Sequence, residues 1–186
     1  MSTRECIRPG GRSARVQESV HKAVNELIAE VGRANVTVPM IAARAGVTPS
    51  TIYRRWGDLA ELLADVALAR LRPDGEPVDT GDVRTDLHAW AEQFFEEMTS
   101  EPGQAMVRDV MASAAAGGEK AQCGAYVREQ IQTIIDRAVQ RGQQAPDADT
   151  IMDHYVAPVM YRNLFYGEPL SAERARALMQ ACLDKA

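Results

Sequence analysis

One short segment of the chain concentrates side chains that can recognise a polyanion. Residues 45–56, AGVTPSTIYRRW, combine three aliphatic hydroxyls, a phenol and two adjacent guanidinium groups, and they contain no carboxylate. Such groups at the start of a helix are the donors that contact base edges and phosphates in a DNA groove. The segment therefore predicts nucleic-acid recognition. A solvated helix face remains the alternative for Arg54 and Arg55, and simple helix packing remains the alternative for Tyr53.

The charge of the chain is divided unevenly between its two parts. The protein has 186 residues and a net charge of -5. Residues 1–72 hold 11 Lys and Arg against 7 Asp and Glu, whereas residues 73–186 hold 10 against 19. We therefore predict a basic domain over residues 1–72 that meets a polyanion, and an acidic domain over 73–186 with another role.

Two short helices joined by a glycine turn form the centre of the first domain. Apolar spacing predicts helices over four segments, 13–31, 38–45, 49–56 and 59–71. Gly46 can adopt the positive φ of a tight turn, and Ile52 then faces inward. This arrangement is a helix-turn-helix, in which Ser50 and Arg54 lie on the side opposite Ile52.

Five further helices are predicted after a turn-rich connector at residues 72–82. They cover about 83–98, 103–116, 119–141, 147–166 and 171–184. Pro158 lies inside the fourth of them, which is expected either to kink there or to be packed around the proline locally. No segment shows the alternation of a β-strand. We therefore expect an all-α protein of about nine helices, with an N-terminal three-helix helix-turn-helix domain and a C-terminal helical domain.

The residue pattern gives no support to catalysis, metal binding or a membrane span. The chain has no nucleophile elbow, no phosphate loop and no paired histidine ligands. Cys6, Cys123 and Cys182 are too widely separated for a zinc site or a disulfide framework, although one of them could be a redox-sensing thiol. No apolar run approaches about 18 residues, and the N-terminus lacks the apolar core of a secretory signal. We expect a cytoplasmic protein that is not an enzyme and has no cofactor.

Residues 37–56, TVPMIAARAGVTPSTIYRRW, followed by DLAELL at 58–63, resemble the DNA-binding domain of the tetracycline-repressor (TetR) family. That family has a T-x₃-I-A-x₂-A-G-V-s-x₂-t-l-Y-x-h-F core and an acidic, Leu-rich fourth helix. The resemblance covers about residues 13–71. It implies a one-component sensor with a small-molecule site in the C-terminal domain. It also implies that the last two helices, which carry Tyr155, Val159 and Met179, pair with their copies in a homodimer.

The resemblance also assigns roles to particular side chains of the first domain. The residues expected to face DNA phosphates are Thr37, Arg44, Thr48, Tyr53 and Arg55. The residues expected to contact base edges are Ser50, Thr51 and Arg54. Arg12 belongs to a basic arm with Arg4, Arg8 and Arg15, which either enters the minor groove, holds phosphates or is a solubilising tail.

Two positions depart from the family pattern. Trp56 stands where the family usually has Phe, and we expect it to be a core aromatic. Leu59 stands where the family usually places a lysine near a DNA phosphate, so one ionic contact in each half-site is expected to be missing.

Six side chains of the second domain are candidates for a ligand cavity, because Met and aromatic residues suit an adaptable apolar pocket. They are Trp90, Phe94, Met98, Met106, Met111 and Tyr126. Ordinary core packing is the simpler interpretation of the same stripe. An effector bound there would be apolar or amphipathic.

The sequence thus predicts a homodimeric, ligand-responsive transcriptional repressor that binds double-stranded DNA at a palindromic operator and is released by a small-molecule effector. One alternative is a protein of the same fold that has impaired DNA binding and acts through protein partners, for which Leu59 is the argument. Another is an all-α enzyme or small-molecule carrier.

Overall fold

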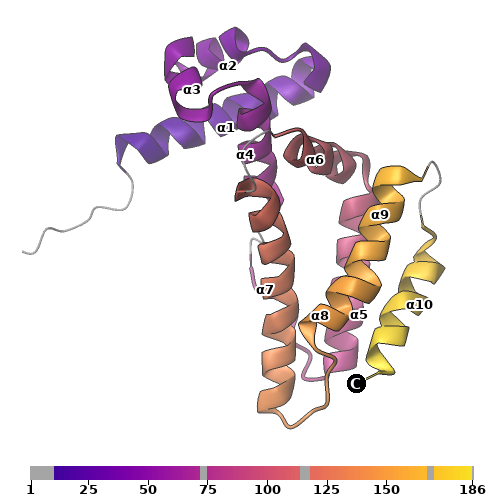
Figure 1. Ribbon diagram of the computed structural model, residues 1–186. Coiled ribbons are helices and arrows are strands. Elements are labelled where there is room, and N and C mark those ends of the chain that lie inside the picture. The colour runs from indigo at the N-terminus through magenta and orange to yellow at the C-terminus, as the bar shows by residue number, and fades with distance from the viewer. Residues whose placement is uncertain (1–10, 72–74, 114–117, 167–169, 186) are drawn as a thin grey trace, which may run out of the picture. The chain divides into compact units, whose positions relative to one another are not determined.

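The computed structural model describes residues 11–71, 75–113, 118–166 and 170–185, and all regular structure among these residues is helical (Figure 1). The chain divides into two compact units, Met1–Val66 and Ala67–Ala186. The division falls inside the helix Leu59–Leu71, upstream of the boundary at residue 72 that composition suggests.

The first unit is built on a helix-turn-helix. Its helices are α1 (Arg12–Val31), α2 (Val38–Ala45), α3 (Pro49–Trp56) and the start of α4 (Leu59–Leu71), with a single 3₁₀ turn at Arg33–Asn35. All four helices contribute side chains to one apolar core. Its completely buried members are Val20, Val24, Ile41, Ile52 and Leu62.

Local signals end and begin the short helices where the sequence predicts. Gly46 has φ +68° and ψ +32°, the left-handed conformation that closes α2. The N–H of Val47 then donates to the carbonyl of Ala42 at 3.0 Å. Asp58 begins α4 by accepting a hydrogen bond from the N–H of Glu61 at 2.9 Å. The turn between α2 and α3 is therefore fixed by residues of the turn itself.

The second unit is a bundle around α5 (Val83–Thr99), which contacts α6, α7, α9 and α10 (Figure 1). The bounds of the other helices are α6 (Glu101–Ala112), α7 (Gly118–Gln140), α8 (Ala148–Ile151), α9 (Ala157–Phe165) and α10 (Ala172–Leu183). A π-helical turn at Met152–Val156 joins α8 to α9 without a break, so the described residues form nine continuous helices.

The π-helical turn explains how Pro158 lies inside a long helix. Proline has no N–H and clashes with the carbonyl four residues before it in a regular α-helix. Just before Pro158, the N–H of Ala157 bonds instead to the carbonyl of Met152, five residues earlier. The chain therefore passes the proline by widening one turn, where the sequence predicts either a kink or local packing around it.

The corner between α5 and α6 requires a glycine. Ser100 caps α6 by accepting from the N–H of Gly103 at 3.1 Å, so the helix begins two residues before the predicted start at Gly103. A Cβ atom at position 103 would lie 1.8 Å from the carbonyl oxygen of Glu97. The two helices can approach this closely because Gly103 has no side chain. The predicted end of this helix at residue 116 lies outside the described residues.

Candidate DNA interface and ligand cavity

The recognition helix α3 exposes a polar face. Ile52 is completely buried against the core, whereas Tyr53 is 50% exposed and Ser50 and Arg54 are exposed as well. Within the described part of the chain, the Arg54 guanidinium makes no hydrogen bond or ion pair and can reach a base edge or a phosphate without breaking one. This face has the donors and the position that major-groove recognition needs.

The hydroxyl groups at the start of α3 form a small network. Thr48 Oγ1 lies 2.9 Å from Ser50 Oγ and 3.0 Å from Thr51 Oγ1. Thr48 occupies the N-cap position, but its side chain makes no capping hydrogen bond with the backbone. Thr51 is half-buried, so Ser50 is the more accessible of the two candidates for base contact.

Arg55 is held by α1. Its guanidinium donates to the carbonyl of Ser13 at 2.9 Å, to Ser13 Oγ at 2.7 Å and to Gln17 Oε1 at 2.6 Å. It also lies 5.1 Å from the ring centroid of Trp56. The side chain therefore joins α3 to the beginning of α1, a role that the double arginine in the sequence does not reveal.

Arg44 is likewise engaged within the protein. It forms a bidentate ion pair with Glu30, in which Nη1 donates to Oε1 at 2.8 Å and Nη2 donates to Oε2 at 2.7 Å. Its Nη1 also donates to Glu26 Oε2 at 3.3 Å. The hydrogen bonds to Glu30 raise the pKa of the guanidinium and lower the pKa of the Glu30 carboxyl. An exposed pair of this kind can open at little cost when a phosphate approaches.

Two further candidates lie at the starts of helices. Thr37 occupies the N-cap position of α2, is exposed and makes no capping bond through its side chain. Arg12 is the first residue of α1, but its side chain lies outside the described part, as do Arg4 and Arg8 of the basic arm.

Trp56 is more than a core aromatic. It packs partly buried against the core, and its Nε1 donates to Asp65 Oδ2 at 2.7 Å. The same carboxylate oxygen lies 2.9 Å from His21 Nε2 and accepts from Gln17 Nε2 at 3.2 Å. Partial burial would raise the pKa of Asp65, but the hydrogen bonds from His21 and Trp56 outweigh it and lower the pKa. No sequence signal singled out Asp65, because its partners lie on two other helices, α1 and α3.

Leu59 packs against the core of the first unit and is partly buried there. The position that departs from the family pattern therefore has an apolar role in this chain.

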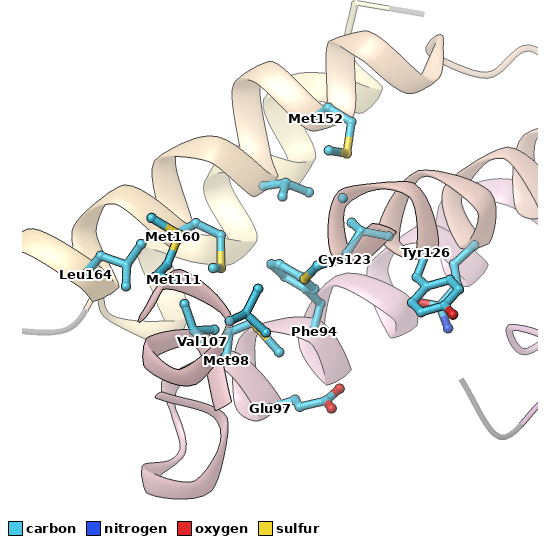
Figure 2. Close-up of a pocket in the computed structure, with 15 residues that line it drawn as sticks. Phe94, Glu97, Met98, Val107, Met111, Cys123, Tyr126, Met152, Met160 and Leu164 are labelled. Carbon is cyan, nitrogen blue, oxygen red and sulfur yellow. The ribbon is translucent and has the colours of Figure 1, made fainter. Parts of the chain in front are cut away.

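The second unit contains an apolar cavity of about 240 Å³ between α5, α6, α7 and the α8–α9 helix (Figure 2). Four of the six candidate residues line it, namely Phe94, Met98, Met111 and Tyr126. This volume is slightly below the usual range for small-molecule sites, so the cavity suits a compact ligand.

The other two candidates, Trp90 and Met106, do not line this cavity. Trp90 is 6% exposed, stacks on Phe94 with ring centroids 5.3 Å apart, and donates from Nε1 to Gln130 Oε1 at 3.1 Å. Met106 packs in a small cluster with Ala67 and Val110. Both are core residues behind the cavity wall, because their helices turn them away from it.

Sequence reasoning missed one wall of the cavity. Met152, Val156, Met160 and Leu164 line it at intervals of four residues from the α8–α9 helix. This helix had been expected to serve the dimer interface, yet Tyr155 and Val159 are buried inside their own unit with 1% exposure. The four-residue spacing of Met152, Val156, Met160 and Leu164 was the signal that could have identified the wall.

Three polar side chains also line the cavity. Gln130 accepts from Trp90, and the Tyr126 hydroxyl accepts from Gln122 Nε2 at 3.0 Å. The third is Glu97, and burial raises the pKa of its carboxyl. Burial and the charge of Glu97 also raise the pKa of the Cys123 thiol, which makes this cysteine a poor nucleophile and argues against redox sensing.

Two family profiles match the chain. The profile described as the C-terminal domain of tetracyclin repressor-like proteins matches residues 77–182, and that of the bacterial regulatory proteins of the tetR family matches residues 22–66. The chain belongs to the TetR family. As a TetR-family protein it is a DNA-binding transcriptional regulator and not an enzyme, so the enzyme alternative is wrong and the all-α prediction is confirmed.

Individual relatives agree with this assignment. The chain is 29% identical over 142 residues to the HTH-type transcriptional regulator AqdR of Rhodococcus erythropolis, covering 76% of this chain and 68% of the relative. It is 32% identical over 139 residues to the DNA-binding transcriptional repressor TetR of Mycobacteroides abscessus, covering 70% and 72%. The crystal structure of the TetR family transcription regulator SCO0332 superposes with a TM-score of 0.69 at 26% identity, covering 92% and 98%.

The described helices of this TetR-family protein include none that is long and apolar enough to cross a membrane.

Proposed function

We propose that this TetR-family regulator is a homodimeric repressor that binds a palindromic operator and leaves it when a small hydrophobic effector enters the cavity. One observation carries the proposal. The chain combines a recognition helix whose polar face is exposed, in one unit, with an apolar cavity of about 240 Å³ in the other.

The contacts with DNA centre on Arg54. Its exposed guanidinium, which has no partner among the described residues, contacts base edges with Ser50 beside it, while Thr37, Thr48 and Tyr53 face phosphates. Arg55 positions α3 against α1 through Ser13 and Gln17, and so supports recognition from within the protein. The two adjacent arginines therefore have different roles: Arg54 contacts DNA, and Arg55 holds the recognition helix in place.

A dimer is supported by an exposed aromatic cluster at the end of α9. Tyr161, Phe165 and Tyr166 are 58%, 69% and 54% exposed. The ring of Tyr161 lies 5.0 Å from that of Phe165 and 6.0 Å from that of Tyr166. Large apolar side chains gathered on a surface favour a protein interface. A dimer also doubles the few base pairs that one short helix can read.

The coupling between effector and DNA runs through α4. This helix begins in the DNA-binding unit, and its residue Ala67 packs against Met106 and Val110 of α6 in the second unit. Val110 also lines the cavity, as does Cys123, which packs on the same cluster. An effector that binds better to one arrangement of this cluster therefore stabilises one position of α4. DNA binds better to a different position of α4, so the two ligands oppose each other.

A salt-titrated binding assay with the DNA upstream of the protein's own gene tests the DNA contacts. Arg54→Ala is expected to weaken specific binding by about tenfold, the loss typical of one base contact. Lys22→Ala removes an exposed charge on α1 that pairs with Glu26, and it is expected to leave specific binding unchanged. Unchanged binding by Arg54→Ala would contradict the assignment.

Sedimentation of the purified protein tests the dimer. We expect the mass of two chains at micromolar concentration, and a shift toward monomer in Phe165→Ser. A monomeric wild-type protein would count against the proposed interface.

A further inference from the structure

Glu97 is the one ionisable acid or base, apart from the phenol of Tyr126 and the thiol of Cys123, among the described residues that line the cavity. The described lining contains no Lys, Arg or His. An anionic ligand would therefore meet a carboxylate and find no cation among these residues. A neutral or cationic ligand would meet no such repulsion.

The Glu97 carboxylate also lacks the kind of partner that Asp86 and Glu92 of α5 have. Asp86 Oδ1 accepts from the N–H of Thr80 at 2.8 Å and from its hydroxyl at 2.6 Å. Glu92 pairs with Arg176 at 2.7 Å. Within the described part of the chain, the Glu97 carboxylate receives no hydrogen bond and forms no ion pair. Glu97 is exposed at the edge of the cavity, yet partial burial still raises the pKa of its carboxyl. Partial loss of water without a replacement partner is unfavourable for a carboxylate.

The Glu97 carboxylate lies on one side of the cavity, and a wall of apolar side chains lies on the other. Figure 2 shows Glu97 across the cavity from Met152 and Met160, with Phe94 between them. Met152, Met160 and Leu164 supply soft apolar groups on the far side. A ligand that fills this space therefore has an apolar body at one end and a group complementary to a carboxylate at the other.

We propose that the effector is a hydrophobic amine whose protonated nitrogen pairs with Glu97 while its apolar body packs against Met152, Met160 and Leu164. This inference rests on the proposed function, because it names the chemical class of the effector. The acidic balance of residues 73–186, 10 Lys and Arg against 19 Asp and Glu, adds a general attraction for cations.

Three compounds with one carbon skeleton test the inference: phenylbutylamine, phenylbutanol and phenylbutyrate. Calorimetry with the full-length protein measures their affinities, and the DNA-binding assay measures release. The amine is expected to bind at least about tenfold more tightly than the alcohol, the usual gain from a charge-assisted hydrogen bond, and the acid is expected to bind most weakly.

Two matched variants locate the effect. Glu97→Gln should bring the affinity for the amine down to that for the alcohol and leave the affinity for the alcohol unchanged. Glu96→Gln removes the neighbouring charge on α5, which is exposed and does not line this cavity, and should retain the preference for the amine. Thermal unfolding confirms that both variants are folded.

The outcomes separate this inference from the function on which it rests. If the alcohol or the acid binds as tightly as the amine, or if Glu97→Gln keeps the preference, the amine is the wrong class and the cavity remains an effector site. If none of the three compounds binds or releases DNA, both the amine inference and the effector role of the cavity are overturned.

Discussion

The indole nitrogen of Trp56 donates a hydrogen bond to Asp65 Oδ2 at 2.7 Å, which joins the last residue of α3 to the middle of α4. His21 Nε2 of α1 lies 2.9 Å from the same oxygen. Three helices of the DNA-binding unit therefore meet at one partly buried carboxylate. The orientation of the recognition helix depends on a polar contact as well as on its apolar anchor Ile52.

Removing this carboxylate should destabilise the DNA-binding unit. We expect Asp65→Ala to lower the free energy of unfolding by about 1–3 kcal/mol, because Trp56 and His21 lose their partner. Chemical denaturation followed by the fluorescence of Trp56, in a Trp90→Phe background, measures the change. Glu18→Ala, an exposed acid on α1, is the control and should change stability little. Equal effects of the two substitutions would contradict the role of Asp65.

The same contact predicts a dependence on pH. Because the pKa of Asp65 is lower in the folded protein, its stabilisation is fully present above the unfolded value of about 4 and is lost as the pH falls through the folded value. Wild-type stability should therefore fall more steeply than that of Asp65→Asn between about pH 5 and pH 2. Parallel curves would show that Asp65 contributes no such linkage.

The adjacent arginines Arg54 and Arg55 should respond differently to substitution by alanine. Arg55→Ala should reduce stability by roughly 1 kcal/mol, because hydrogen bonds to Ser13 and Gln17 and the contact with Trp56 are lost. Arg54→Ala should leave the melting temperature unchanged and weaken DNA binding alone. Thermal unfolding of the two variants side by side distinguishes them, and the reverse order would invalidate the assignment of roles.

Leu59→Lys should restore a phosphate contact at the cost of packing. Each added contact makes the log–log dependence of DNA affinity on salt steeper by about 0.9 per protomer. The substitution also removes an apolar side chain from the edge of the core, so the melting temperature should fall. Fluorescence anisotropy at several salt concentrations measures the slope. A slope identical to that of the wild type would place residue 59 away from the phosphates.

Two glycines of the second unit should respond oppositely to alanine. At Gly103 the added Cβ would lie 1.8 Å from a backbone oxygen, so the α5–α6 corner must shift and stability should fall by more than about 1 kcal/mol. At Gly124, inside α7, no described atom beyond the neighbouring residues and the local helix backbone lies within 4 Å of the added Cβ. Gly124→Ala should therefore stabilise the helix by about 0.5–1 kcal/mol. Thermal unfolding checks both signs, and destabilisation by Gly124→Ala would contradict the open space at that position.

Features that depend only on residues close together in the chain, such as helix ends, could be predicted from the sequence. Gly46, Pro49 and Asp58 act within one turn of their positions, so the ends of α2, α3 and α4 follow from local chemistry. The inward position of Ile52 follows from helical spacing in the same way.

Features that depend on packing between distant segments could not be predicted in this way. Asp65 meets His21 across 44 positions of the chain, and no local pattern contains that distance. Trp90 and Met106 are residue types that commonly line apolar cavities, but the packing of α5 and α6 against their neighbours decides which helix faces meet the ligand space. The orientation of each helix face depends on many weak contacts between distant segments, and no short stretch of sequence contains them all.

The π-helical turn at Met152–Val156 also corrects the register of the cavity wall. In a regular α-helix, residues spaced four apart are displaced around the helix axis by about 40° at each step. Four such residues in succession therefore do not all face the same neighbouring element. A π-helical turn closes its bonds one residue later and rotates less per residue, which offsets part of that drift. Met152, Val156, Met160 and Leu164 can therefore face one ligand along the whole wall. The π-helical turn that accommodates Pro158 thus keeps the cavity-lining side chains before and after it on the same face of the helix.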